Sequence, residues 1–197
     1  MIPMLAINNK MNRRISMTKE AKKKQFRMQS LKRLEKVSRS GSYKKDKTIV
    51  HALYQYIVEN KANTVMLYIP LGTEVNVHPL IQRLRKEKKL LYVPFMEGAS
   101  FRLVKYRLPL KKKQFGIKEP NDSKQYRLKN IDIAIVPIVG VDTTHRRVGF
   151  GKGMYDRFYE KQNEYIKQTV FVARELCYSK EIITDDYDVK ADMIITA

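Results

Sequence analysis

The sequence predicts an α/β fold: a single three-layer domain with a mostly parallel central sheet and helices on both faces. Two apolar runs, residues 64–69 and 90–93, are each followed by a proline, as short buried strands are. Residues 78–88 between them have a helical pattern. A strand, a helix and a strand within about thirty residues form a βαβ unit, in which the two strands are parallel. Residues 131–137 are a third apolar run and the clearest buried strand in the chain.

Two helices are predicted before the first strand. Residues 18–37 are strong helix formers, and Thr18 stands where an N-cap is expected. The Gly41-Ser42 pair breaks this pattern. A second amphipathic helix follows, with apolar residues at i, i+4, i+7 and i+8: Ile49, Leu53, Tyr56 and Ile57.

The later elements complete the predicted sheet. We expect a short strand at 101–106, a loop at 108–123, a helix ending near 166, and strands at 169–173 and 193–196. Ligands of open α/β sheets bind beyond the carboxyl ends of the strands. The loops after Ile69, Val93 and Val136 should therefore meet at one site.

The first sixteen residues differ in character from the rest. They are basic and lack acidic residues, like a transit peptide, but the apolar stretch at 2–7 is too short for a secretory signal. Met17 is an alternative start. We expect residues 1–16 to be a disordered basic extension and residues 17–197 to form a single α/β domain.

The net charge of +20 calls for an anionic partner or a reason to do without one. Residues 1–60 hold fifteen Lys and Arg against four Asp and Glu. Three interpretations are open: nucleic-acid binding, a solvated basic helix, or a small anionic substrate drawn in by the same field.

The cysteine content and the hydropathy of the chain indicate the cellular compartment in which the protein works. Cys177 is the only cysteine, which excludes an intramolecular disulfide and suits a reducing cytoplasm. A buried structural thiol is the favoured interpretation of this residue. No apolar run is long enough to cross a bilayer. We therefore expect a cytoplasmic protein that does not enter the membrane.

Residues 146–156 are the most informative stretch of the chain. Glycine has no Cβ and tolerates positive φ, so alternate glycines allow backbone N–H groups to surround a bulky anion. A helix starting near Lys152 would direct its dipole to the same point. Arg147 and Lys152 add full charge, and Asp156 could hold magnesium between phosphates. These features predict a triphosphate site around Gly149, Gly151 and Gly153.

The spacing of this loop excludes two commoner phosphate sites. A Walker loop ends in Gly-Lys-Ser/Thr, whereas Lys152 is followed by Gly153. In a dinucleotide fingerprint the third glycine would fall on Met154. The plain alternative is a glycine-rich turn before a surface helix, with Lys152 and Asp156 as an i,i+4 ion pair.

A longer pattern, which resembles that of a known family, favours the triphosphate site over the plain glycine-rich turn. Its strongest element is the run Pro137-x-x-Gly140-Val141-Asp142, continued by Arg147-Val148-Gly149-x-Gly151-x-Gly153-x-Tyr155-Asp156. From about Lys23 to the C-terminus the chain resembles the 5-formyltetrahydrofolate cyclo-ligases, also called 5,10-methenyltetrahydrofolate synthetases. Three weaker elements agree with it: Glu74-Val75-Asn76-Val77, Asp188-Val189-Lys190-Ala191-Asp192, and Lys23-x-x-x-Arg27.

The sequence departs from the family pattern at four positions. Met154 stands where tyrosine is usual and His145 where glycine is common. Asn76 and Val77 replace aspartate and threonine. None of these departures removes a charged group that the chemistry requires.

The resemblance implies a reaction and a set of roles. ATP and 5-formyltetrahydrofolate would give 5,10-methenyltetrahydrofolate, ADP and phosphate through phosphorylation of the formyl oxygen. Arg147 and Lys152 would be catalytic. ATP would be bound by Lys23, Arg27, Arg147, Gly149, Gly151, Lys152, Gly153 and Tyr155. The folate would be bound by Ile69, Glu74, Phe150, Met154 and Tyr155, and magnesium by Asp156 and Asp188.

The resemblance also bears on partners and on ordinary roles. It implies ATP as co-substrate, Mg²⁺ and a reduced folate that includes polyglutamylated forms. A monomer is expected as well, although the resemblance does not supply that expectation. Without the resemblance, Lys23 and Arg27 would be a solvated basic face and Ile69 a core residue. Asp132 and Asp142 are expected to serve turns or caps.

Two other classes of protein stay open. A basic RNA- or ribosome-associated module is favoured by the net charge and by Tyr43, Tyr56 and Tyr68, but no RNP-type motif is present. Another ATP-dependent or sugar-phosphate enzyme could share the fold. Glu74 and Asp188 together distinguish the cyclo-ligase from another phosphate-binding enzyme, because a simple phosphate binder needs neither residue.

Overall fold

The computed structural model describes residues 17–112, 118–120 and 130–197. The predicted extension at 1–16 lies outside the described residues. The centre is a six-stranded sheet of order β11-β9-β6-β1-β2-β3. Its strands are β1 Thr64–Met66, β2 Leu90–Glu97, β3 Ser100–Lys105, β6 Ile131–Pro137, β9 Ile166–Ala173 and β11 Met193–Thr196. All neighbours are parallel except the β2–β3 hairpin, which confirms the mostly parallel sheet.

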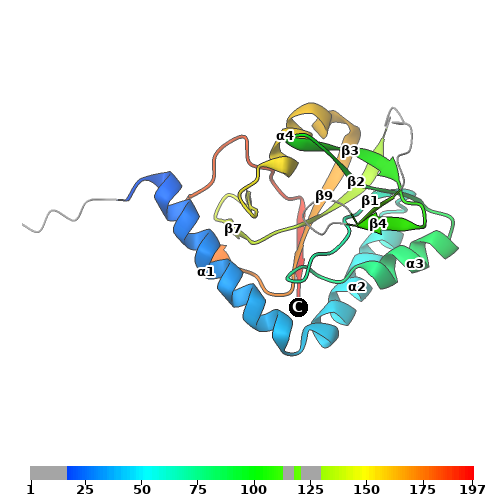
Figure 1. Cartoon of the computed structure of the whole chain (residues 1–197), viewed down its shortest axis with the longest axis horizontal. Helices are drawn as coiled ribbons and strands as arrows, with labels where there is room; N and C mark the ends of the chain where they lie inside the picture. The colour runs from blue at the N-terminus through cyan, green and yellow to red at the C-terminus, as the bar shows by residue number, and fades with distance from the viewer. Residues whose placement is uncertain (1–16, 113–117, 121–129) are drawn as a thin grey trace, which may run out of the picture.

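Helices cover both faces of this sheet, so the predicted three layers are confirmed (Figure 1). The helices are α1 Lys19–Arg39, α2 Ser42–Glu59, α3 His78–Lys86 and α4 Met154–Gln162, the last followed by the 3₁₀ turn η2 Asn163–Tyr165. Leu53 of α2 and Leu80 of α3 pack with Val65 and Ile133 on one face. Phe158 of α4 packs with Met66 and Val136, on the opposite face. Alternate residues of each strand thus serve two cores, as the strand period of two requires.

Helix α1 runs along the edge of the molecule and packs on a third, smaller cluster. Leu34 is buried there with Val139 and Cys177, so the cysteine is a buried thiol as predicted. The Thr18 hydroxyl accepts a hydrogen bond from the Ala21 N–H at 3.3 Å, which confirms the N-cap. Gly41 separates α1 from α2 with a φ of +76°.

Two smaller sheets accompany the central one. The first contains β7 Gly140–Asp142, β8 Arg147–Val148 and β10 Tyr178–Ser179. The second pairs β4 Leu110–Lys112 with β5 Lys118–Pro120. The stretch predicted as a loop at 108–123 therefore holds two short strands. Within it, residues 113–117 and 121–123 lie outside the described part.

Strand β2 does not end before Pro94, as the sequence predicted, but continues to Glu97. Its partner β1 pairs only as far as Tyr92, so the missing N–H of Pro94 interrupts no ladder on that side. On the other side β2 pairs with β3, which includes Pro94 opposite Leu103. Strand β1 is shorter than predicted. The Leu67 N–H still donates to the Tyr92 carbonyl of β2 at 2.8 Å, and residues 68–69 then leave the ladder.

Helix α4 is also shorter than predicted at both ends. It begins at Met154 because Gly153 has a φ of +61°, outside the helical region. It ends at Gln162, since η2 and then β9 follow and Ile166 is already paired with Ile131. Within the described ranges, no helix has the length and apolar character needed to traverse a bilayer.

Candidate active site

The loops at the carboxyl ends of the strands surround a cavity of about 400 Å³. It is lined by Ile69 after β1, by Pro94 and Met96 of β2, and by Pro137 at the end of β6. The predicted meeting of these segments is confirmed, although β2 itself lines the cavity and not a loop after Val93. All five residues predicted to bind the folate line it: Ile69, Glu74, Phe150, Met154 and Tyr155.

Arg147 is the buried cation of this cavity. It lies on β8, is 6% exposed, and its Nε donates to the Pro137 carbonyl at 3.1 Å. Its guanidinium lies over the Tyr155 ring, with 4.7 Å from Cζ to the ring centroid. The stack and the hydrogen bond hold the charge at the wall of the cavity.

The three glycines are required for two different reasons. Gly151 and Gly153 have φ values of +92° and +61°, which glycine adopts without steric cost. At Gly149 the reason is space, because a Cβ there would lie 2.6 Å from Cζ of Arg147. His145 adopts a φ of +57°, so this residue takes up the left-handed conformation that glycine enters more easily.

Lys152 is exposed at the cavity, and it is not paired with Asp156. Within the described part of the chain no ion pair or hydrogen bond joins these two side chains. Asp156 instead accepts a hydrogen bond from the Val189 N–H at 3.5 Å. The alternative interpretation, a surface turn with an ion pair between Lys152 and Asp156, is therefore wrong, because that ion pair is not formed between these two described residues.

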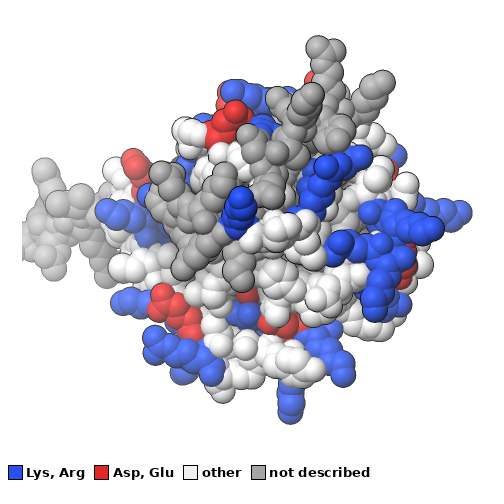
Figure 2. Space-filling model, turned by 45° about the vertical axis from the view of Figure 1, so that its right-hand side comes forward, with Lys and Arg blue, Asp and Glu red and all other residues white. Residues whose placement is uncertain are grey.

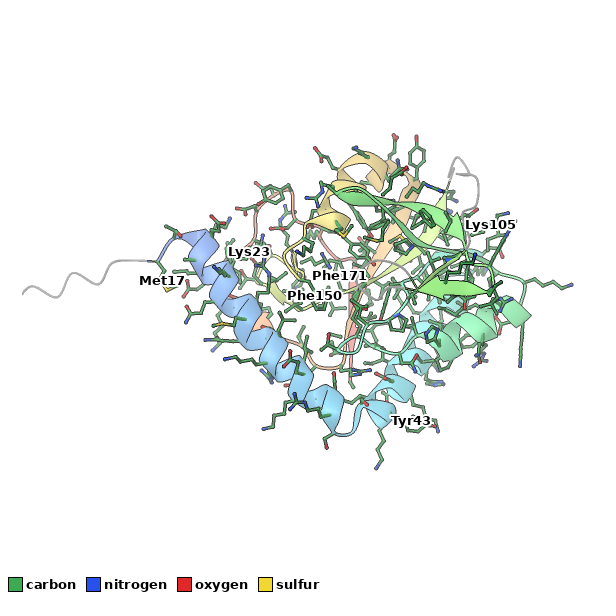
Figure 3. The ribbon with its side chains drawn as sticks, viewed as in Figure 1. Met17, Lys23, Tyr43, Lys105, Phe150 and Phe171 are labelled. Atoms are coloured by element: carbon green, nitrogen blue, oxygen red, sulfur yellow. The ribbon has the colours of Figure 1, made fainter. Side chains whose placement is uncertain are left out.

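Helix α1 brings Arg27 to the glycine loop and Lys23 to Asp188. Arg27 Nε donates to the Gly149 carbonyl at 2.8 Å, and its guanidinium also lies against Gly151. Lys23 donates to Oδ2 of Asp188. Figure 3 shows Lys23 projecting from α1 on the side of the glycine loop, where Phe150 is labelled. The predicted basic pair is not a solvated face.

Asp188 and Asp156 are the predicted metal ligands, and Asp156 accepts from the N–H of Val189, the residue after Asp188. Asp188 is 4% exposed, and its Oδ2 also accepts from the Asp185 N–H at 2.7 Å. Both carboxylates act on Tyr187, whose pKa is raised first by its hydrogen bond to Asp185. The described residues include no group of three or more His, Cys, Asp or Glu side chains that could hold a metal by themselves. Two carboxylates do fit Mg²⁺, which usually takes its remaining ligands from phosphates and water.

Glu74 is the acidic group of the cavity. It lies on the loop after β1, and its Oε2 accepts from the Leu71 N–H at 2.8 Å. Burial raises the pKa of Glu74 to about 7, against the opposite effects of the Leu71 N–H, Arg147 and Arg174. A carboxyl group with a perturbed pKa in an apolar cavity is typical of a functional site. Burial, followed by the charge of Glu74, also raises the pKa of Tyr155.

Asp142 and Asp132 both have structural roles. Asp142 forms a turn with Thr144, as predicted, whereas Asp132 lies within β6 and bonds to the start of β1, which is neither a turn nor a helix cap. Asp142 accepts from the N–H groups of Thr144, Ile183 and Thr184, each at 2.9 Å, and so ties two loops together. Asp132 accepts from the N–H groups of Asn63 and Thr64. Although burial opposes it, hydrogen bonds from Lys167 and these N–H groups lower the pKa of Asp132 to about 2.

Arg157 is a residue of the site that the sequence analysis missed. Its Nε donates to the Ala99 carbonyl at 2.8 Å and its Nη2 to the Lys152 carbonyl at 2.5 Å. It thereby ties the tip of the β2–β3 hairpin to the glycine loop at the rim of the cavity. The only available signal was its position one turn into the helix after the loop.

The chain is similar in sequence to several 5-formyltetrahydrofolate cyclo-ligases. The model of the 5-formyltetrahydrofolate cyclo-ligase family matches residues 19–197. The Haemophilus influenzae 5-formyltetrahydrofolate cyclo-ligase is 25% identical over 175 residues, which cover 85% of this chain and 94% of that one. The mouse (Mus musculus) enzyme of the same name is 24% identical over 163 residues, covering 76% of this chain and 78% of its own.

Solved structures agree with these sequence matches. The Aquifex aeolicus 5,10-methenyltetrahydrofolate synthetase superposes with a TM-score of 0.71 at 28% identity, covering 88% of this chain and 89% of that one. The Mycoplasma pneumoniae 5,10-methenyltetrahydrofolate synthetase has the same fold, with a TM-score of 0.67 at 22% identity, covering 88% of this chain and 97% of that one.

Proposed function

Because the chain belongs to the 5-formyltetrahydrofolate cyclo-ligase family, we propose that its cavity and the adjoining Lys23–Asp188 corner bind 5-formyltetrahydrofolate and ATP side by side. The activity is that of an ATP-dependent 5-formyltetrahydrofolate cyclo-ligase acting in one-carbon metabolism. The observation that supports the two-ligand site best is that Glu74, Arg147 and Lys152 line a single cavity.

The chemical difficulty is the formyl amide. Conjugation with nitrogen makes its carbon a poor electrophile, and the same resonance gives amides a rotation barrier of roughly 18–20 kcal/mol. The formyl oxygen attacks the γ-phosphorus of ATP, and ADP leaves. N10 of the folate then adds to the activated carbon and loses its proton, and phosphate leaves as the ring closes. The protein must chiefly align the two ligands and stabilise charge.

Arg147 and Lys152 are assigned the catalytic charges. Arg147 is held at the cavity wall by Pro137 and Tyr155, so its guanidinium needs little reorganisation to meet charge that develops on the transferred group. Lys152 is exposed and can reach phosphate oxygens as a mobile point charge. Lys23, Arg27 and the amides of the glycine loop would hold the rest of the triphosphate, because α1 already contacts this loop.

Glu74 and the apolar wall are assigned to the pterin ring. Pterins carry amino and N–H donors, which a carboxylate accepts well. Ile69, Phe150, Met154 and Tyr155 supply apolar surface at the same cavity. An apolar cavity with one acidic acceptor suits the polarity of such a ring.

Asp156 and Asp188 would hold magnesium. When bound, the ion would neutralise part of the triphosphate charge. Asp188 lies beside Lys23, which is assigned to the triphosphate. Asp156 lies in the first turn of α4, directly after the glycine loop. Both carboxylates are of the hard-oxygen type that magnesium prefers.

The remaining expectations concern partners and compartment. Lysine and arginine side chains are spread over the face shown in Figure 2, which favours anionic substrates with additional carboxylates, such as polyglutamyl folates. A monomer and a cytoplasmic location stay predictions. The second of these is supported by a buried, unpaired Cys177.

The test is direct. Purified protein, ATP, magnesium and 5-formyltetrahydrofolate should produce the absorbance of the methenyl product, and omission of ATP should abolish it. A protein that forms no product, yet binds RNA tightly and without sequence preference at physiological salt, would contradict the proposal and support the RNA-module alternative.

A further inference from the structure

A buried guanidinium, that of Arg174, connects four parts of the fold. Arg174 directly follows the last residue of β9 and is 6% exposed. Its Nε and Nη2 donate to the two carboxylate oxygens of Asp46 on α2, at 2.7 and 2.9 Å. Its Nη1 donates to the Ser38 hydroxyl of α1 at 2.8 Å and to the Gly72 carbonyl at 3.1 Å.

Net stability is a weak explanation for this arrangement. A buried ion pair must overcome the desolvation of both charges, and apolar residues of similar volume often do as well or better. What a planar guanidinium does provide is fixed geometry, because its donors point in set directions. Here those directions relate α1, α2 and β9 to the loop after β1.

That loop carries Glu74, two residues after Gly72. No atom lies within 4 Å of a Cβ built at Gly72, so packing on this side does not hold the residue in place. The next fixed points are the Leu71 N–H, which is bonded to Glu74 itself, and the Val75 carbonyl, which accepts from the Tyr68 hydroxyl at 2.9 Å. The turn that contains Gly72 is closed by the Glu74 N–H, which donates to the Leu71 carbonyl at 3.0 Å. Among the described residues, Arg174 is the side chain that ties Gly72 itself to the body of the domain.

We infer that Arg174, anchored by Asp46 and Ser38, is a positioning residue that fixes Gly72 and thereby sets the orientation of Glu74 for folate binding. This inference rests on the proposed role of Glu74 at the pterin ring. Arg174 also lies close enough to Glu74 for its charge to act on the carboxyl group, together with that of Arg147.

The test is a double variant, Arg174→Met with Asp46→Leu, which removes both charges and leaves neither buried alone. We expect KM for 5-formyltetrahydrofolate to rise about tenfold, which corresponds to about 1.4 kcal/mol, while KM for ATP changes less than about twofold. Calorimetric titration with 5-formyltetrahydrofolate in the absence of ATP should show the same loss of affinity. Arg174→Lys keeps the charge but loses the forked donors of the guanidinium. This variant should likewise raise KM for 5-formyltetrahydrofolate and leave KM for ATP nearly unchanged.

A matched control is available one residue along the chain. The pair Arg33–Glu175 also joins α1 to the segment after β9 but does not contact Gly72. Arg33→Met with Glu175→Leu should leave both KM values unchanged. Equal losses for folate and ATP in the Arg174 variants, with a lowered melting temperature, would mean a merely structural role and overturn the inference.

Glu74→Gln, measured in parallel, separates this inference from the proposed function. If Glu74→Gln weakens folate binding and the Arg174 variants do not, the positioning role is wrong and the proposed function stands. If Glu74→Gln leaves folate binding unchanged, the assignment of Glu74 to the pterin ring fails, and the inference fails with it.

Discussion

The ammonium group of Lys23 is hydrogen-bonded to the carboxylate of Asp188, which lies 165 residues further along the chain. Lys23 also lies 3.8 Å from Asp185, and Lys19 is paired with Asp185 at 2.8 Å. Helix α1 is thereby held against the segment before β11 by a row of opposite charges. The cation that we propose for phosphate and the anion that we propose for magnesium thus neutralise one another here.

Asp156→Ala should abolish most of the turnover and shift the magnesium dependence to higher concentrations. The reason is the loss of one of the two carboxylates that would orient the ion between phosphates. Steady-state rates across a magnesium titration at saturating ATP are the measurement. Glu160→Ala, at an exposed position one turn further along α4, is the control. Full activity of Asp156→Ala under these conditions would remove Asp156 from the metal site.

Lys152→Met should lower kcat/KM for ATP by roughly ten- to hundredfold, because a charge-assisted contact to phosphate is worth about 1.5–3 kcal/mol. The fold should be unaffected, since Lys152 is exposed and buries little surface. Lys161→Met, exposed near the other end of α4, is the matched control. An unchanged ATP dependence would return Lys152 to the role of an ordinary surface lysine.

Glu74→Gln should change stability in a pH-dependent way. The pKa of Glu74 is about 7 in the folded protein, above its ordinary value of 4.5. The folded state therefore favours the protonated form, and the stability contributed by this group is lost as the pH rises through 7. Relative to the parent protein, the variant should melt at about the same temperature at pH 5 and at a higher temperature at pH 8. A difference in melting temperature that does not grow with pH would contradict the raised pKa.

Binding of the folate should show the opposite dependence on pH. If the ionised carboxylate accepts from the pterin ring, KM for 5-formyltetrahydrofolate should rise as the pH falls below about 7, the pKa of Glu74. Glu74→Gln should give a high KM that does not vary across this range. The comparison needs kcat/KM profiles for both proteins between pH 5.5 and pH 8.5, roughly 1.5 units either side of that pKa.

Gly149→Ala should impair catalysis more than stability. The new Cβ would come within 2.6 Å of Cζ of Arg147, so the guanidinium would have to leave its place over Tyr155. We expect a loss of about tenfold or more in kcat/KM, since a displaced charge-assisted contact costs at least about 1.5 kcal/mol. Gly72→Ala is the control, because a Cβ there meets open space and the substitution keeps the carbonyl that accepts from Arg174. Equal activity of the two variants would show that the position of Arg147 does not matter.

Longer glutamate tails should improve the substrate at low salt. The net charge of +20 attracts carboxylates, and this attraction is screened as the ionic strength rises. The measurement is kcat/KM for mono- and polyglutamyl 5-formyltetrahydrofolate at two ionic strengths. A tail effect that does not depend on salt would point to a specific pocket and not to the general field.

The local features of this protein were determined by the sequence itself. The apolar run at 131–137 predicts a buried strand from the local sequence alone, without knowledge of the strands that pair with it. Strand β6 spans the same residues. The positive φ of Gly151 and Gly153 follows from the loop's own spacing, and the N-cap at Thr18 from a contact three residues away. The motif from Pro137 to Asp156 is contiguous, which is why it carried the family assignment.

Only the tertiary structure decided which charges meet. The bond between Lys23 and Asp188 and that between Arg174 and Asp46 join residues more than a hundred positions apart, and no periodicity in the chain relates them. The contact of Arg157 with Ala99 depends on the β2–β3 hairpin. The sequence did not predict this hairpin, because in the sequence Pro94 indicates the end of the strand. The raised pKa of Glu74 has the same origin, because burial depends on the packing of several loops and not on the residues beside it.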